Sequence, residues 1–138
     1  MKNNNYSFFK NKKILITGHT GFKGSWLSLY LTNLGAKVYG ISNNIPTKPS
    51  HYKNINLEKK IHKSIFVDIN NRKKLINIFN KIKPDFVFHL AAQAIVKQSF
   101  ENPSLTWHTN TIGTLNVLEA LKFLKSNRTV TAILITSD

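Results

Sequence analysis

A strand, a glycine-rich turn and a helix follow one another in residues 13–34, and this order constrains the fold more than any other part of the chain. Residues 14–17 are apolar or β-branched, glycines follow, and apolar residues then recur at helical spacing. In such a unit Gly18 allows a tight turn, Gly21 lets the backbone approach a pyrophosphate, and Gly24 lets the helix lie close to the sheet. The free amides and dipole at the start of the helix favour an anion. The G-x-x-G-x-x-G spacing differs from the usual G-x-G-x-x-G, but its context predicts a dinucleotide site rather than a purely structural turn.

Strands and helices alternate through the rest of the chain. Short apolar segments predict strands at 36–41, 64–67, 86–90 and 129–136, helical spacing predicts helices over 70–83 and from 102–104 to about 126, and prolines mark 44–60 as a loop. This alternation predicts the α/β class, with a Rossmann-type, doubly wound parallel sheet truncated after the fifth strand. We expect residues 1–12 to be a polar leader and residues 13–138 to form one incomplete dinucleotide-binding domain.

Candidate site residues follow the strands, because ligands bind such sheets at the carboxyl ends of the strands where the strand order reverses. The glycine turn should therefore converge there with Asp68, with Ala91 and Ala92, and with Ser137 and Asp138. The small side chains of the two alanines would admit cofactor phosphates and ribose, or else a closely packed helix.

Two further positions bear on the adenosine half of a cofactor. The acid that usually ends the second strand and binds the ribose is replaced by Ser42-Asn43-Asn44. Asn44 can still bond a ribose hydroxyl, so these residues leave NAD and NADP both open. Asp68 could accept a hydrogen bond from the adenine amine while Ile69 covers the ring, or Asp68 could simply be a helix N-cap. The nearby His89 is interpreted as a core histidine rather than an acid or base.

Composition limits the function classes. The formal charge is +14 and the pI about 10.2, but only two of the 20 basic residues are Arg and the lysines are scattered. We therefore expect a solvated lysine-rich surface and no nucleic-acid partner. The absence of cysteine excludes a disulfide framework and zinc-finger sites, and no metal site is expected. No apolar run is long enough to span a membrane and the amino terminus does not resemble a secretory signal, so a cytoplasmic location is expected.

Several motifs together resemble a known family. They are TGHTGFKG at 17–24, Asp68-Ile69, HLAAQ at 89–93, TNTIGTLNVLEA at 109–120 and TSD at 136–138. The combination resembles the extended short-chain dehydrogenase/reductase family of NAD-dependent epimerases and dehydratases, which acts on nucleotide sugars. Within that family, the run GHTGFKGSWLSLYL, the segment IPTKPS and the HLAAQ motif are most similar to the 4,6-dehydratases that use CDP-glucose.

This resemblance implies an NAD cofactor, a nucleotide-sugar substrate and a redox cycle. Hydride would leave the sugar C4, water would be lost across C5 and C6, and hydride would return to C6. Ser137 would polarise the C4 oxygen and Asp138 would act as the acid for the departing C6 hydroxyl. Thr20, Phe22 and Leu90 would join the cofactor site, Thr109 would lie by the nicotinamide half, and Asn110 would be structural. The whole enzyme would be a homodimer.

The resemblance also places the family's Tyr-x-x-x-Lys pair and its sugar-binding part beyond residue 138. We therefore expect this chain to be the amino-terminal, cofactor-binding portion of a dehydratase and to be inactive alone. The alternatives are a nucleotide-sugar 4-epimerase or another sugar-nucleotide dehydratase, a non-catalytic dinucleotide-binding module, and a basic nucleic-acid-binding protein.

Overall fold

A five-stranded parallel sheet forms the centre of the computed structural model, which describes residues 8–126 and 129–136. The strand order is β3-β2-β1-β4-β5. The bounds are Lys13–Thr17 for β1, Lys37–Ser42 for β2, Lys63–Phe66 for β3, Phe86–His89 for β4 and Thr131–Leu134 for β5. The chain builds outward from β1 to β3 and then crosses to the other side of β1, so the strand order reverses between β1 and β4. The predicted Rossmann-type sheet is confirmed.

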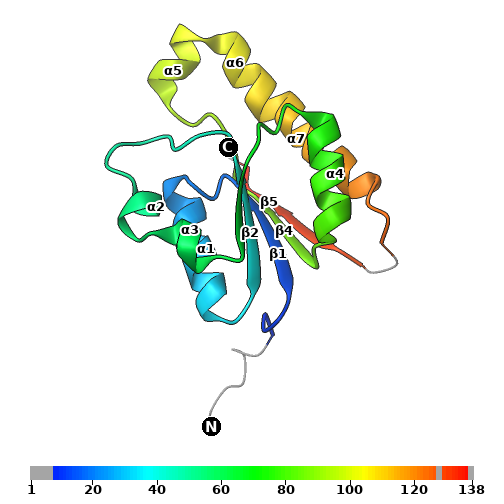
Figure 1. Ribbon diagram of the computed structural model, residues 1–138. Helices are drawn as coiled ribbons and strands as arrows, with labels where there is room; N and C mark the ends of the chain where they lie inside the picture. Colours follow the sequence, from blue (N-terminus) through cyan, green and yellow to red (C-terminus); the bar gives the residue numbers. More distant parts are fainter. Residues whose placement is uncertain (1–7, 127–128, 137–138) are drawn as a thin grey trace.

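Helices cover both faces of the sheet (Figure 1). On one side lie α1 (Phe22–Asn33) and two short helices, α2 (His51–Asn54) and α3 (Leu57–Lys60). On the other side lie α4 (Arg72–Ile82) and α7 (Gly113–Lys122). The connection from β4 to α7 contains α5 (Val96–Glu101), α6 (Pro103–Trp107) and the π-helical turn η2 (His108–Ile112). In Figure 1, α5 and α6 project beyond one end of the sheet.

The two faces bury separate cores because successive side chains of a strand point to opposite faces. Ile14 and Ile16 of β1 pack with Leu31 of α1 on one face. Leu15 of β1 packs with Phe79 of α4 on the other, together with side chains of α7. Both faces are therefore apolar, as near-continuous apolar strands predict.

Two expectations about local structure were wrong. Residues 44–60 are not all loop, because α2 and α3 form where Tyr52 and Leu57 are buried against the α1 face. The expected long helix is divided into α6, η2 and α7 and ends at Lys122, while α5 was not predicted. Residues 8–12, the described part of the expected leader, form a turn in which the ring of Phe9 lies 5.5 Å from that of Phe86.

Strand and helix ends differ from the predictions by one or two residues in most other places. Leu34 is the C-cap of α1, and Gly35 follows it with φ +81° and its N–H bonded to the carbonyl of Thr32. None of the helices formed by the described residues is both long and apolar enough to cross a membrane.

Candidate functional site

The glycine turn joins β1 to α1 and lies against the end of β4. Gly18 has φ +77°, and a Cβ atom there would lie 2.8 Å from the backbone nitrogen of Ala91. A Cβ at Gly24 would lie 2.1 Å from the carbonyl oxygen of Gly18, so α1 packs directly on the turn. Only glycine fits these two positions without movement of the backbone. The turn, α1 and the Leu90-Ala91 backbone therefore meet where the strand order reverses.

The first turn of α1 presents backbone amides without a side-chain cap. Gly21 is the N-cap residue, with extended backbone, and no side chain bonds the free amides of the first turn. Phe22 is 72% exposed, so its ring does not pack in the core beside these amides. Free amides together with the helix dipole favour an anionic group at this point.

His19, between the first two glycines of the turn, is fully buried and has a hydroxyl partner at each ring nitrogen. Nδ1 lies 3.0 Å from Ser42 Oγ, and Nε2 lies 2.7 Å from Ser64 Oγ. The hydroxyl of Tyr52 lies 3.0 Å from the same Ser64 oxygen. Burial lowers the pKa of His19 to about 4, against smaller raising effects of the Ile41 carbonyl and Glu58. A neutral imidazole therefore ties the turn to β2 and β3.

Thr20 and Asn44 meet at the end of β2. The Thr20 hydroxyl donates to the Asn44 carbonyl at 2.6 Å, and the Thr20 amide donates to Ser42 Oγ at 3.3 Å. The side chain of Asn44 is exposed, so its amide group is accessible to a ligand such as a ribose. These two hydrogen bonds therefore attach the segment after β2 to the glycine turn.

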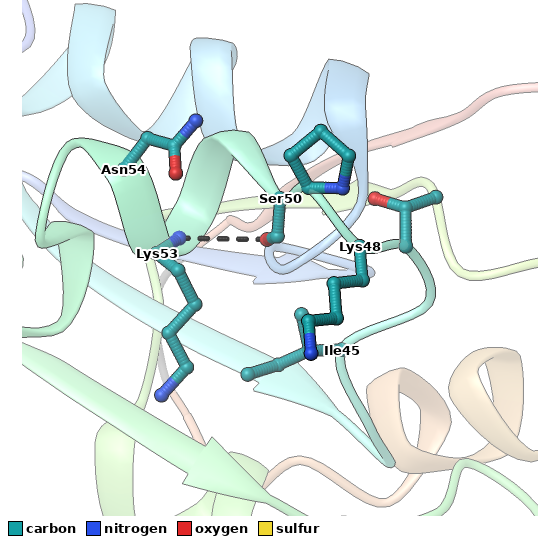
Figure 2. Close-up of a pocket in the computed structure, with 7 residues that line it drawn as sticks. Ile45, Lys48, Ser50, Lys53 and Asn54 are labelled. Atoms are coloured by element: carbon teal, nitrogen blue, oxygen red, sulfur yellow. Dashed lines mark hydrogen bonds between the residues drawn. The ribbon is translucent and has the colours of Figure 1, made fainter.

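A cavity of about 700 Å³ adjoins this segment, between residues 45–50 and the last two residues of α2. Figure 2 shows Lys48 and Lys53 extending in the same general direction, and the Lys53 amide bonded to Ser50 Oγ. Seven residues line it, namely Ile45, Thr47, Lys48, Pro49, Ser50, Lys53 and Asn54. The two ammonium groups give this part of the surface a positive potential.

Asp68 and Ile69 follow β3, two strands away from β1 at the same edge of the sheet. Asp68 is exposed, and its Oδ1 accepts from the amide of Asn70 at 2.8 Å. It is not the N-cap of α4, because that position is taken by Asn71. Ile69 is only 5% exposed and packs in the core, so it could contact a cofactor through its backbone but not by covering an adenine ring.

The segment after β4 is held by hydrogen bonds to the last residue of β1. The amide of Leu90 donates to the carbonyl of Thr17 at 3.1 Å, and the amide of Ala91 donates to the Thr17 hydroxyl at 3.2 Å. Ala92 is exposed. His89 is 3% exposed and burial lowers its pKa, which agrees with its interpretation as a core histidine.

Thr109 and Asn110 lie in the π-helical turn η2. Asn110 accepts from the backbone amide of Gln93 at 2.8 Å and donates to the backbone carbonyl of the same residue at 3.1 Å. This double hydrogen bond attaches the segment after β4 to η2, consistent with a structural role for Asn110. Thr109 is partly exposed beside it.

The two catalytic candidates, Ser137 and Asp138, lie outside the described residues. Within the described ranges, no three His, Asp or Glu side chains are grouped so as to hold a metal ion. The hydroxyl partners of the two buried histidines were not predicted from the sequence, because a lone Ser or Thr at a strand end gives no distinctive signal.

Comparisons with known proteins agree with this geometry. The family described as GDP-mannose 4,6 dehydratase matches residues 15–138. CDP-glucose 4,6-dehydratase of Salmonella typhimurium is 43% identical over 132 residues, which are 96% of this chain and 36% of the relative. The chain thus spans about a third of the length of that relative.

Solved structures are also similar to this chain over most of its length. An epimerase from Methanothermobacter thermautotrophicus superposes with a TM-score of 0.74 at 32% identity, over 87% of this chain and 34% of that one. The UDP-glucose 4-epimerase of Thermus thermophilus, solved in complex with NAD, superposes with a TM-score of 0.70 at 33% identity. The match covers 80% of this chain and 34% of that one. With residues 15–138 matched by the family and the glycine turn seated at the strand-order reversal, this chain belongs to the GDP-mannose 4,6-dehydratase family.

Proposed function

We propose that this chain is the cofactor-binding portion of an NAD-dependent nucleotide-sugar 4,6-dehydratase, a lyase that converts CDP-glucose to CDP-4-keto-6-deoxyglucose and water. The observation that carries the proposal is the close approach of three backbone segments at the end of β1, where a Cβ at Gly18 or Gly24 would collide with backbone atoms. Such a side-chain-free cradle suits a diphosphate, which needs main-chain amides at short range. The 43% identity to a CDP-glucose 4,6-dehydratase supports the choice of substrate.

The residues present fit NAD. The turn and the first amides of α1 would hold the pyrophosphate, Asn44 the adenosine ribose, Asp68 the adenine, and the segment after β4 with Thr109 the nicotinamide side. The set comprises Gly18, Thr20, Gly21, Phe22, Gly24, Asn44, Asp68, Ile69, Leu90, Ala91, Ala92 and Thr109. When bound, NAD supplies a reversible hydride acceptor for oxidation of the sugar.

The chain's own proton chemistry falls to Ser137 and Asp138. A Ser hydroxyl can donate a hydrogen bond to the C4 oxygen of the sugar, and a carboxylic acid can protonate the departing C6 hydroxyl. Because the family's Tyr-x-x-x-Lys pair would lie beyond residue 138, the chain alone is proposed not to complete the reaction. The whole enzyme is proposed to be a cytoplasmic homodimer.

A nucleotide-sugar 4-epimerase is the second candidate, favoured by the structural likeness to UDP-glucose 4-epimerases. The two activities are distinguished by their product. With CDP-glucose, an enzyme that contains these residues is expected to form a 4-keto product lacking the C6 oxygen. A C4-inverted sugar that keeps the C6 hydroxyl, identified by NMR, would identify an epimerase instead.

Calorimetric titration with NAD tests the cofactor site. Gly21→Asp puts a carboxylate among the amides that would meet the pyrophosphate, so we expect NAD binding to be abolished. Asn77→Asp, on the exposed surface of α4, adds the same charge away from the turn and should leave the affinity within about twofold. Unchanged affinity of Gly21→Asp for NAD would refute the pyrophosphate site. If a longer protein that contains this chain binds NAD but does not turn over nucleotide sugars, a non-catalytic dinucleotide-binding module would be favoured instead.

A further inference from the structure

His89 lies at the carboxyl end of β4 and contacts two elements that border the proposed cofactor site. Its Nδ1 is 2.6 Å from the hydroxyl of Thr17, the last residue of β1. Its Nε2 is 2.9 Å from the hydroxyl of Thr114, in the first turn of α7. The side chain is 3% exposed, so water does not compete for either nitrogen. The imidazole therefore bridges the strand that enters the glycine turn and the helix that follows η2.

The neighbouring backbone groups fix the direction of each hydrogen bond. The Thr114 hydroxyl also lies 2.7 Å from the carbonyl oxygen of Asn110, which can only accept. The single hydroxyl proton of Thr114 is therefore used toward Asn110, and Thr114 Oγ1 must accept a proton from His89 Nε2. A neutral imidazole carries one N–H, so Nδ1 must accept from the Thr17 hydroxyl. That hydroxyl in turn accepts from the Ala91 amide at 3.2 Å.

These contacts form one continuous chain of hydrogen bonds with a single direction. It runs from the amide of Ala91 through Thr17, His89 and Thr114 to the carbonyl of Asn110. Every donor and acceptor along it is satisfied once the imidazole is the Nε2–H tautomer. In the opposite tautomer the unprotonated Nε2 would face the oxygen of Thr114, whose proton is used toward the Asn110 carbonyl, so two acceptors would meet and one hydrogen bond would be lost.

We infer that His89, as the Nε2–H tautomer, is a positioning residue that fixes the end of β1, the segment after β4 and η2 relative to one another. This role rests on the proposed function, because those three segments would hold the pyrophosphate and nicotinamide side of NAD. Asn110 extends the effect, since its side chain makes two hydrogen bonds to the Gln93 backbone. His89 itself would not touch the cofactor or the substrate.

The tautomer is measured directly on the unaltered chain. Long-range ¹H–¹⁵N correlation spectra at neutral pH should show a protonated Nε2 and an unprotonated Nδ1 for His89, assigned by comparison with His89→Gln. An Nδ1–H tautomer or a doubly protonated ring would overturn the inference, whether or not the chain binds NAD.

Binding of NAD tests the positioning role. Thr114→Val keeps the shape of the side chain but removes the hydroxyl, and should weaken NAD binding about tenfold, the equivalent of one hydrogen bond. Thr114→Ser keeps the hydroxyl and should restore the affinity, while Thr131→Val, on the exposed surface at the amino end of β5, should leave it unchanged. Tight NAD binding that Thr114→Val leaves unaltered would overturn the positioning role and leave the proposed function standing. No NAD binding by the unaltered chain would refute the proposed function, and with it the positioning role, while the tautomer would still be decided by NMR.

Discussion

The packing of α1 on the glycine turn can be tested by adding one methyl group at Gly24. A Cβ there would lie 2.1 Å from the Gly18 carbonyl oxygen, 2.8 Å from its carbon and 2.9 Å from the Cα of His19. Real Cβ contacts essentially never fall below 3.0 Å, so α1 must move away from the turn by about 1 Å. All three neighbours are backbone atoms, which cannot rotate aside as a flexible side chain would.

The expected loss of stability follows from two opposing effects. Overpacking of this kind costs about 3 kcal/mol, at the upper end of the usual range because backbone must shift. Replacing Gly by Ala inside a helix returns about 1 kcal/mol. We therefore expect Gly24→Ala to lower the free energy of unfolding by about 2 kcal/mol and the melting temperature by roughly 6–10 °C in a chain of this size.

Gly21→Ala is the matched control. Its Cβ would meet a single atom, the Gly18 carbonyl oxygen, at 3.3 Å, and Gly21 has φ −71°, which Ala adopts freely. Its stability should stay within about 0.5 kcal/mol of the parent chain. NAD affinity should fall in both variants, because Gly24→Ala displaces the amides and Gly21→Ala obstructs the approach of the pyrophosphate. Urea and thermal denaturation followed by circular dichroism measure the stabilities; a Gly24→Ala chain as stable as the parent would refute the packing argument.

Three further predictions concern other parts of the chain. His19 has a pKa of about 4 in the folded chain, against 6.5 in the unfolded chain, so the unfolded state takes up the proton first as pH falls. The free energy of unfolding should therefore drop by about 2 kcal/mol between pH 7 and pH 5 from this group alone. Urea titrations of the parent and His19→Gln at both pH values check this, and an equal pH dependence in the two chains would contradict it. The exposed edge strand β5 should promote self-association, so Ile133→Lys should shift the sedimentation of the chain toward monomer, whereas a parent chain that is already monomeric would disprove the edge argument. Asn110→Asp removes the donor to the Gln93 carbonyl and should raise amide hydrogen exchange in residues 91–95 while leaving β1 protected; unchanged exchange would count against the double hydrogen bond.

The sequence predicted the parts of the fold that local pattern determines. The strands, the glycine turn and α1 follow from apolar spacing and glycine placement within a few neighbouring residues. The convergence of Gly18 with Ala91 also followed, because parallel strands bring their carboxyl ends to one edge of the sheet. The positions of Ser137 and Asp138 remain predictions.

The parts that were missed depend on contacts between distant segments. The four residues of α2 are too few to show periodicity, and that helix is held by burial of Tyr52 rather than by local propensity. The π-helical turn η2 accompanies the attachment of Asn110 to Gln93, 17 residues earlier in the chain. His19 offered no local sign of its partners, because Ser42 and Ser64 lie 23 and 45 residues away.

The burial of His19 has a consequence for how this chain can vary. A Cβ at Gly40 would lie 2.2 Å from the His19 ring, so the imidazole occupies the volume that a side chain in the middle of β2 would otherwise take. Positions 19 and 40 therefore share one space, and a larger residue at either requires a smaller one at the other. Across related sequences the two positions should co-vary, and a library that randomises one of them alone will recover few folded clones.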